Sequence, residues 1–250
     1  MQTNPLMPTN AYQQLWIELP PINGGQPQRL LVFLHGAGSN PDSFAPVAIA
    51  WQLKFPTAAA FILQASLPSA VPAPEGFAPR FDWLPSHNHE HSAVRGAALT
   101  VEKAIRTIQA ETGLGAHQTV VIGYSQGATV ALDTARLAPK VADIVVSYAG
   151  QLNGAILAVE KISASALHLI HGELDSVVTV DKAQRAYSQL MLAHGDVTLD
   201  ILENGTHTID QDSINVGTTR TMQTIFRGRK KNLGVTKTER LNPISADKLH

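Results

Sequence analysis

The chain has 250 residues, of which 44% are hydrophobic, and its 19 basic and 20 acidic side chains nearly cancel. This length suits one α/β domain with one core, and the near-neutral charge argues against a nucleic-acid-binding protein. No apolar run is long enough to cross a membrane, and residues 1–10 lack the pattern of a secretory signal. The absence of cysteine excludes disulfides, thiolate catalysis and cysteine-ligated metals, and a cytoplasmic location is the default expectation.

Apolar runs bounded by turn residues predict a series of buried strands. Such near-continuous hydrophobic runs are typical of parallel strands that are covered on both faces. The run that ends at Leu202 alternates more and is expected nearer the sheet edge, and residues 15–19 form a further candidate strand at the start. The predicted strands cover residues 29–35, 58–64, 119–123, 142–148, 166–171 and 197–202.

Stretches with helical periodicity lie between these strands, over residues 92–110, 125–137 and 180–193. Gly113 follows the first of them as a stop signal. Alternating strands and helices indicate βαβ units, so the fold class is α/β with a mostly parallel sheet and helices on both faces.

Two segments depart from this alternation. Residues 65–90 are rich in proline and lack periodicity, so we expect a long surface excursion, and no inserted cap domain is visible. Residues 227–250 are rich in lysine and arginine and poor in large apolar side chains. The sequence therefore predicts one domain over residues 1–226 and a flexible basic tail over 227–250.

The segment Gly123-Tyr124-Ser125-Gln126-Gly127 fits the pattern G-x-S-x-G and lies between a predicted strand and a predicted helix. In α/β-hydrolases the serine of this pattern is a nucleophile on a strained turn, where side chains at the two glycine positions would collide with neighbouring backbone. The alternative is that Ser125 only caps the helix that follows.

A serine nucleophile needs a base, and the base needs an orienting acid. In α/β-hydrolases the acid comes next in the chain, in a loop after a later strand. Asp175 lies a few residues past the strand 166–171 and is the favoured acid. Glu173, close to the strand end, and Asp181, expected to open the next helix, are the competing candidates.

The base is expected after the following strand. His207 lies in the loop that follows residues 197–202, and Gly205 gives this loop freedom to turn. The other histidines considered, His117, His194 and His250, flank other elements or lie in the tail. His207 is therefore the predicted base.

A developing oxyanion needs two backbone N–H donors. One is expected from Gln126, the residue after the nucleophile, and the other from a loop after an early strand. Ala37 lies in such a loop, between Gly36 and Gly38, and is the predicted second donor. The alternative is a simple glycine-rich turn without a ligand.

Together these residues resemble the phospholipase/carboxylesterase family of α/β-hydrolases, which includes acyl-protein thioesterases. Within this family the resemblance is strongest to small bacterial carboxylesterases. The resemblance implies the α/β-hydrolase fold, the triad and oxyanion hole named above, and Trp83 as a residue lining the acyl groove. Ser39 stands where members often have aspartate, which leaves the anchoring of the oxyanion loop open. The matching segments are LVFLHGAGSN, RFDWLP, VVIGYSQGATVAL, LHLIHGELDSVV and VTLDILENGTHTID.

The expected activity is that of a serine carboxylesterase which hydrolyses small or short-chain carboxylic esters through an acyl-enzyme, without a cofactor. Acyl thioesters and lysophospholipids are the alternative substrates, and a non-catalytic ligand-binding α/β-hydrolase is the alternative of another class. The expected partner is a small-molecule ester or thioester, and a homodimer is left open.

The segment His87-Asn88-His89-Glu90-His91 raises the question of a metal site, because imidazole and carboxylate ligands suit zinc. It lies in a proline-rich stretch just before a predicted helix, so a solvated loop is the favoured interpretation. We therefore predict no metal site.

Overall fold

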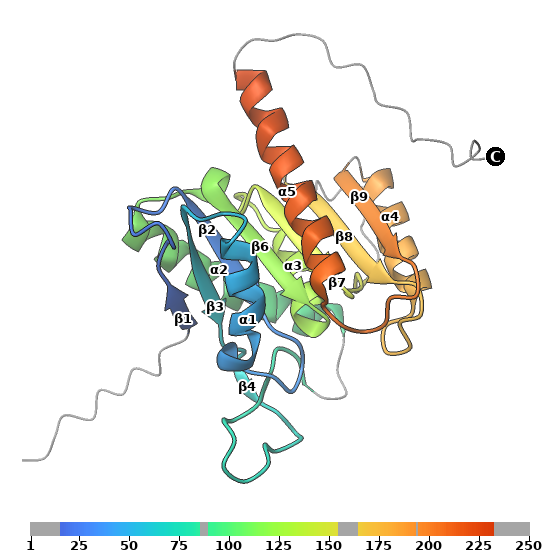
Figure 1. The fold of residues 1–250 in the computed structure, drawn as a ribbon. Helices are drawn as coiled ribbons and strands as arrows, with labels where there is room; N and C mark the ends of the chain where they lie inside the picture. Colours follow the sequence, from blue (N-terminus) through green and yellow to red (C-terminus); the bar gives the residue numbers. More distant parts are fainter. Residues whose placement is uncertain (1–15, 86–89, 155–164, 194, 233–250) are drawn as a thin grey trace, which may run out of the picture.

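The computed structural model describes residues 16–85, 90–154, 165–193 and 195–232 (Figure 1). Its central sheet has seven strands in the order β1-β3-β2-β6-β7-β8-β9, and only β1 is antiparallel to its neighbour. The strands are β1 (Trp16–Leu19), β2 (Arg29–Leu34), β3 (Ala58–Leu63), β6 (Thr119–Tyr124), β7 (Ile144–Tyr148), β8 (Ala166–Gly172) and β9 (Asp196–Leu202). The α-helices are α1 (Pro41–Gln52), α2 (His91–Thr112), α3 (Gln126–Thr134), α4 (Val180–Leu192) and α5 (Gln211–Asn232).

Helices cover both faces of the sheet. Helices α1 and α5 lie side by side over one face, and α2, α3 and α4 cover the other (Figure 1). The central strand β2 shows why both faces must be covered: Leu30, Val32 and Leu34 enter one core, while Leu31 and Phe33 enter the other. Side chains alternate across a strand, so a strand that is apolar at every position needs a partner layer on each side. The predicted mostly parallel sheet between two helical layers is confirmed.

Helices α1 and α5 are not among the elements predicted from the sequence. The N-terminus of α1 nevertheless carries a local signal, because the Asn40 side chain accepts a hydrogen bond from the Ser43 amide at 2.9 Å and Pro41 begins the helix. Helix α5 continues through residue 227, so residues 227–232, which were predicted to belong to a flexible tail, are helical. The remainder of that predicted tail lies outside the described residues.

The proline-rich excursion returns on itself as a hairpin at the carboxyl end of the parallel strands. Two short antiparallel strands, β4 (Leu67–Pro68) and β5 (Phe81–Asp82), form its base. The loop 69–80 between them projects away from the sheet (Figure 1) and exposes Val71 and Phe77. Among the helices of the described segments, none is both long and apolar enough to span a bilayer.

The contact between α5 and the sheet depends on a glycine. A Cβ atom at Gly217 would lie 2.0 Å from the hydroxyl oxygen of Tyr148 and 3.1 Å from the Trp51 ring. Both aromatic side chains are almost completely buried, so neither can move aside into solvent. Gly217 therefore allows α5 to approach β7 and α1 at this point.

We predict that Gly217→Ala lowers the free energy of unfolding by about 1–3 kcal/mol, because overpacking outweighs the gain in helix propensity. Gly96→Ala is the matched control. Gly96 lies in α2 and is exposed, and a Cβ atom added there would meet no neighbouring group within 4 Å. The control should gain up to about 1 kcal/mol. Urea denaturation measures both values, and an equal gain in the two variants would contradict this account of α5 packing.

Candidate active site

Ser125 lies on a sharp turn between β6 and α3. Its φ of 52° and ψ of −115° are unusual for a residue with a side chain. A Cβ at Gly123 would lie 2.5 Å from the Ala128 Cα, and one at Gly127 would lie 2.4 Å from the carbonyl oxygen of His35. The two glycines of the motif therefore let strand, helix and the end of β2 approach one another closely, as the sequence pattern predicts.

Ser125, His207 and Asp175 form one hydrogen-bonded chain. The Ser125 Oγ lies 2.9 Å from His207 Nε2, and His207 Nδ1 lies 2.7 Å from Asp175 Oδ2. The Asp175 carboxylate is fully buried, whereas the imidazole of His207 keeps 16% of its surface exposed. The structure thus brings the three residues predicted from the sequence together, with the nucleophile candidate at the accessible end.

The loops that carry Asp175 and His207 are bonded to each other. The Glu173 amide donates to the carbonyl of Leu202, and the Leu174 amide donates to that of Gly205, at 2.9 and 2.8 Å. A Cβ at Gly172 would meet the Gly205 carbonyl carbon at 2.5 Å. Gly172 therefore allows the two loops to touch, and a Cβ at Gly205 would in turn lie 3.0 Å from the Gly172 Cα.

The competing acids do not bond to His207 in the described structure. Glu173 is exposed and its carboxylate accepts from the Asn204 amide at 3.2 Å. Asp181 lies in the first turn of α4, where its carboxylate pairs with Arg185. An acid in that first turn has a structural role at the positive end of the helix dipole.

The Asp175 carboxylate is held in its ionised form. Burial raises its pKa, but the hydrogen bond from His207 and those from the amides of Val178 and Val177 outweigh burial, so the pKa lies below its ordinary value. His171 adds to this environment. Its Nε2 donates to the Val178 carbonyl at 2.6 Å and lies 3.3 Å from Asp175 Oδ2. An ionised Asp175 orients the imidazole and favours its protonated form.

The predicted oxyanion donors belong to two segments that adjoin Ser125: Gln126 follows it directly, and a Cβ at Gly36, the residue before Ala37, would lie 3.6 Å from the Ser125 Cβ. Gln126 is the first residue of α3, where the amide has no acceptor within the helix. Ala37 is exposed in the loop after β2. This loop is fixed by its neighbour, because the Gly38 amide donates to Asp82 Oδ1 at 2.6 Å and to the Phe81 carbonyl at 3.1 Å. Asp82, which sequence reasoning missed, therefore anchors this loop, whose anchoring the resemblance had left open because of Ser39.

A buried histidine supports the same loop from inside. His35 Nδ1 donates to the Gly36 carbonyl at 2.7 Å, and its Nε2 accepts from the Ala65 amide at 3.2 Å. This pattern requires a neutral imidazole with its proton on Nδ1. Desolvation by burial is the main reason why the pKa of His35 lies below its ordinary value, which agrees with that state.

Trp83, predicted to line an acyl groove, is 4% exposed and packs on the His35 ring with centroids 5.4 Å apart. Its indole N–H donates to the His35 carbonyl at 2.8 Å, and its backbone amide donates to the Gln126 side-chain oxygen at 2.6 Å. Trp83 thus connects the loop after β2 to the start of α3. Its contact with an acyl group stays a prediction.

Tyr124 positions the loop of His207. Its hydroxyl donates to the His207 carbonyl at 2.7 Å, and the two rings lie 5.3 Å apart. Phe44 of α1 stacks on the tyrosine ring with centroids 6.3 Å apart. Burial, and then the charge of Asp175, raises the pKa of Tyr124, so its hydroxyl remains a donor. The variable position of G-x-S-x-G gives no sequence signal for this role.

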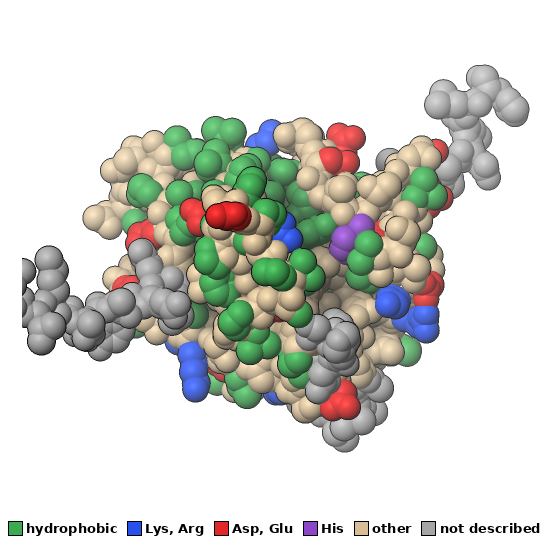
Figure 2. Space-filling model, turned by 90° about the horizontal axis from the view of Figure 1, so that it is seen from below, with side chains coloured by type: hydrophobic (Ala, Val, Ile, Leu, Met, Phe, Trp, Pro, Cys, Tyr) green, Lys and Arg blue, Asp and Glu red, His purple; other side chains and the backbone are tan. Residues whose placement is uncertain are grey.

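Figure 2 views the face at the carboxyl ends of the parallel strands, and hydrophobic side chains cover much of it, with a histidine among them. In the segment that raised the question of a metal site, His87, Asn88 and His89 lie outside the described residues. In the parts of the chain that are described, no cluster of three or more histidine, aspartate or glutamate side chains is arranged to hold a metal ion.

Comparison with known proteins shows which family the chain belongs to. The sequence model of the phospholipase/carboxylesterase family matches residues 22–221. The chain belongs to this family. It is 32% identical over 191 residues to esterase YpfH of Escherichia coli K12, covering 75% of this chain and 79% of that protein. The family is one of carboxylesterase-type hydrolases, so the expected enzyme class is confirmed.

Solved structures show the same fold. The crystal structure of esterase PE8 superposes with a TM-score of 0.72 at 27% identity and covers 83% of this chain and 97% of its own. The Bacillus cereus carboxylesterase superposes with a TM-score of 0.68 at 15% identity, covering 84% and 93% of the two chains. This hydrolase therefore has the predicted α/β-hydrolase fold.

We predict that Tyr124→Phe lowers kcat for p-nitrophenyl acetate about tenfold with little change in KM, because small displacements of catalytic groups are costly. Tyr187→Phe is the matched control, because Tyr187 lies in α4 and is also partly buried. This variant should keep the wild-type kcat. Initial rates over a range of substrate concentration separate the two constants. A loss confined to KM, or an equal loss in the control, would contradict the positioning role.

Proposed function

We propose that this hydrolase is a serine carboxylesterase that cleaves small or short-chain carboxylic esters through an acyl-enzyme on Ser125. The observation that carries the proposal is the chain of two hydrogen bonds, at 2.9 and 2.7 Å, from Ser125 through His207 to the buried Asp175. A serine hydroxyl is a weak nucleophile by itself, and such a chain is the arrangement that activates it.

The chemical step follows from the positions of the polar atoms. As the Ser125 Oγ attacks the ester carbonyl carbon, His207 Nε2 takes the hydroxyl proton, and Asp175 stabilises the resulting imidazolium. His207 then gives the proton to the leaving alcohol as the carbon–oxygen bond breaks. In the second half, His207 takes a proton from the water that attacks the acyl carbon. It then returns this proton to the Ser125 Oγ as the bond between that oxygen and the acyl carbon breaks and the acid leaves.

The amides of Ala37 and Gln126 are the proposed oxyanion donors. Each such donor in a comparable site contributes about 3–4 kcal/mol to transition-state stabilisation, because it is oriented before charge develops. The bonds from Gly38 to Asp82 and from Trp83 to the Gln126 side chain support this role, since they fix the two segments that carry the proposed donors.

Substrate size is proposed from the surroundings of Ser125. The hairpin with loop 69–80 is the one large excursion next to the oxyanion loop in the described segments, and the Asn40 side chain bonds to the Pro79 carbonyl at its base. A site bordered by one hairpin rather than a helical cap suits small or linear acyl groups. The cytoplasmic location and the homodimer stay predictions.

We expect Ser125→Ala to lower kcat on the order of 10⁶-fold and Asp175→Asn about 10⁴-fold, because the first removes the nucleophile and the second misorients the imidazole. Ser188→Ala, at an exposed serine of α4 that bonds only to its own helix backbone, is the control and should retain full activity. A fluorophosphonate probe should label wild type but not Ser125→Ala. Labelling of neither protein would favour the non-catalytic binding alternative.

We also expect kcat/KM to be highest for acetyl and butyryl esters and to fall for octanoyl and palmitoyl esters. The measurement is a panel of p-nitrophenyl esters, the matching thioesters and a lysophosphatidylcholine, with Ser125→Ala as the blank for each substrate. A preference for palmitoyl thioester, or for the lysophospholipid, would replace the short-chain carboxylesterase proposal with the corresponding alternative.

A further inference from the structure

A cavity borders Trp83 and Ala65, which support the oxyanion loop, and we call it the α2 cavity. It has a volume of about 500 Å³ and is bounded by the β1–β3 edge of the sheet, the base of the proline-rich hairpin and one side of α2. This volume is within the range of small-molecule sites. Its apolar wall is formed by Trp16, Leu63, Phe81, Trp83, Val101 and Ala104.

The charge in the lining of the α2 cavity is positive. Among the described residues that line it, Lys103 is the charged one, and none is acidic. The neighbouring acid of the same helix, Glu102, is instead paired with Arg106 at 3.4 Å. Gln64 and Ser66 add uncharged hydrogen-bonding groups to the lining. An apolar wall next to an ammonium group is complementary to a hydrocarbon that carries one negative charge.

The inner wall of this cavity also supports the candidate active site. Trp83, whose indole N–H donates to the His35 carbonyl, and Ala65, whose amide donates to His35 Nε2, both line the cavity. No member of the Ser125–His207–Asp175 chain lines it. A ligand there would contact residues that hold the oxyanion loop and no residue of the Ser125–His207–Asp175 chain.

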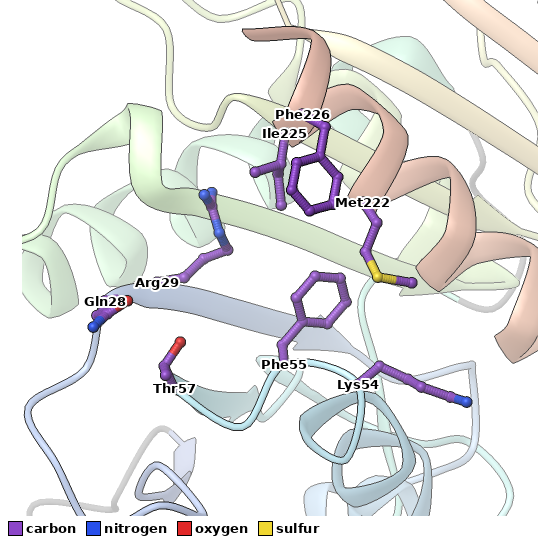
Figure 3. A pocket seen from close by; sticks show the side chains of 8 residues that line it. All are labelled: Gln28, Arg29, Lys54, Phe55, Thr57, Met222, Ile225 and Phe226. Atoms are coloured by element: carbon purple, nitrogen blue, oxygen red, sulfur yellow. The ribbon is translucent and has the colours of Figure 1, made fainter. Parts of the chain in front are cut away.

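Another cavity with basic residues fits such a ligand less well. It lies between the start of β2, the segment after α1, and α5 (Figure 3). Its lining includes Phe55, Met222, Ile225 and Phe226 together with the basic residues Arg29 and Lys54. Its volume is about 210 Å³, less than half that of the α2 cavity. It supplies a useful control, because Lys54 offers the same charge beside an apolar surface elsewhere in the fold.

We propose that the α2 cavity is a binding site for an amphipathic monocarboxylate, with the hydrocarbon against Trp16 and Trp83 and the carboxylate at Lys103. Binding at this cavity does not depend on the proposed esterase activity, because it needs neither Ser125 nor His207.

Octanoate is the probe, and intrinsic tryptophan fluorescence of the full chain is the readout, since Trp16 and Trp83 line the cavity and Trp51 is buried elsewhere. We expect a saturable change with octanoate and about tenfold weaker binding of octylammonium, because loss of one charge-assisted contact changes affinity by about that factor.

Variants locate the site. Lys103→Gln should weaken octanoate binding about tenfold, and Ala104→Phe, which fills the cavity, should abolish it. Lys54→Gln is the matched control and should bind as wild type does. Thr100→Glu, at an exposed position of the lining, adds an anion without filling the core and should also weaken octanoate binding. It keeps the test decisive if Ala104→Phe does not fold.

Four outcomes would overturn the proposal. They are the absence of a saturable signal in wild type, equal affinity for octanoate and octylammonium, loss of binding in Lys54→Gln, and wild-type binding in both Lys103→Gln and Thr100→Glu. The last outcome would show that octanoate binds outside the α2 cavity. Because no readout involves turnover, failure of the esterase proposal would leave the result of this experiment unchanged.

Discussion

The turn from β6 into α3 depends on backbone approaching backbone where side chains would not fit. A Cβ at Gly123 or Gly127 would come within about 2.5 Å of atoms of α3 or of the end of β2. The same turn holds Ser125 at a positive φ and places the amide of Gln126 at the start of the helix. The proposed nucleophile and one proposed oxyanion donor are therefore positioned by one local constraint, and the other groups of the candidate site lie around it.

The proposed acid and base, Asp175 and His207, lie in two loops that are bonded to each other. The strands β8 and β9 are parallel neighbours, and the loops after them are joined by backbone hydrogen bonds and by the close approach of Gly172 to Gly205. The hydroxyl of Tyr124 then ties the His207 carbonyl to the strand that carries the nucleophile. The proposed catalytic geometry is thus set by backbone contacts between loops, which resist displacement better than exposed side chains do.

The proline-rich hairpin has a structural role at the oxyanion loop. Asp82 holds the Gly38 amide, and Trp83 holds both the His35 carbonyl and the Gln126 side chain. A neutral, buried His35 completes this arrangement. The hairpin that borders the proposed substrate site is therefore also the support of the proposed oxyanion loop, and through Trp83 it forms part of the α2 cavity.

The sequence by itself determined the parallel sheet and the order Ser125, Asp175 and His207, because buried strands and tight turns leave local patterns of apolar residues and glycine. The sequence of helix α5 gives a weaker signal, because it is polar and threonine-rich and has modest helix propensity. Packing of residues such as Ile214 on the sheet stabilises this helix. The anchoring by Asp82 and Tyr124 was decided only by the tertiary structure. These contacts join segments 44 and 83 residues apart, and no local pattern in a single sequence records which distant groups will meet.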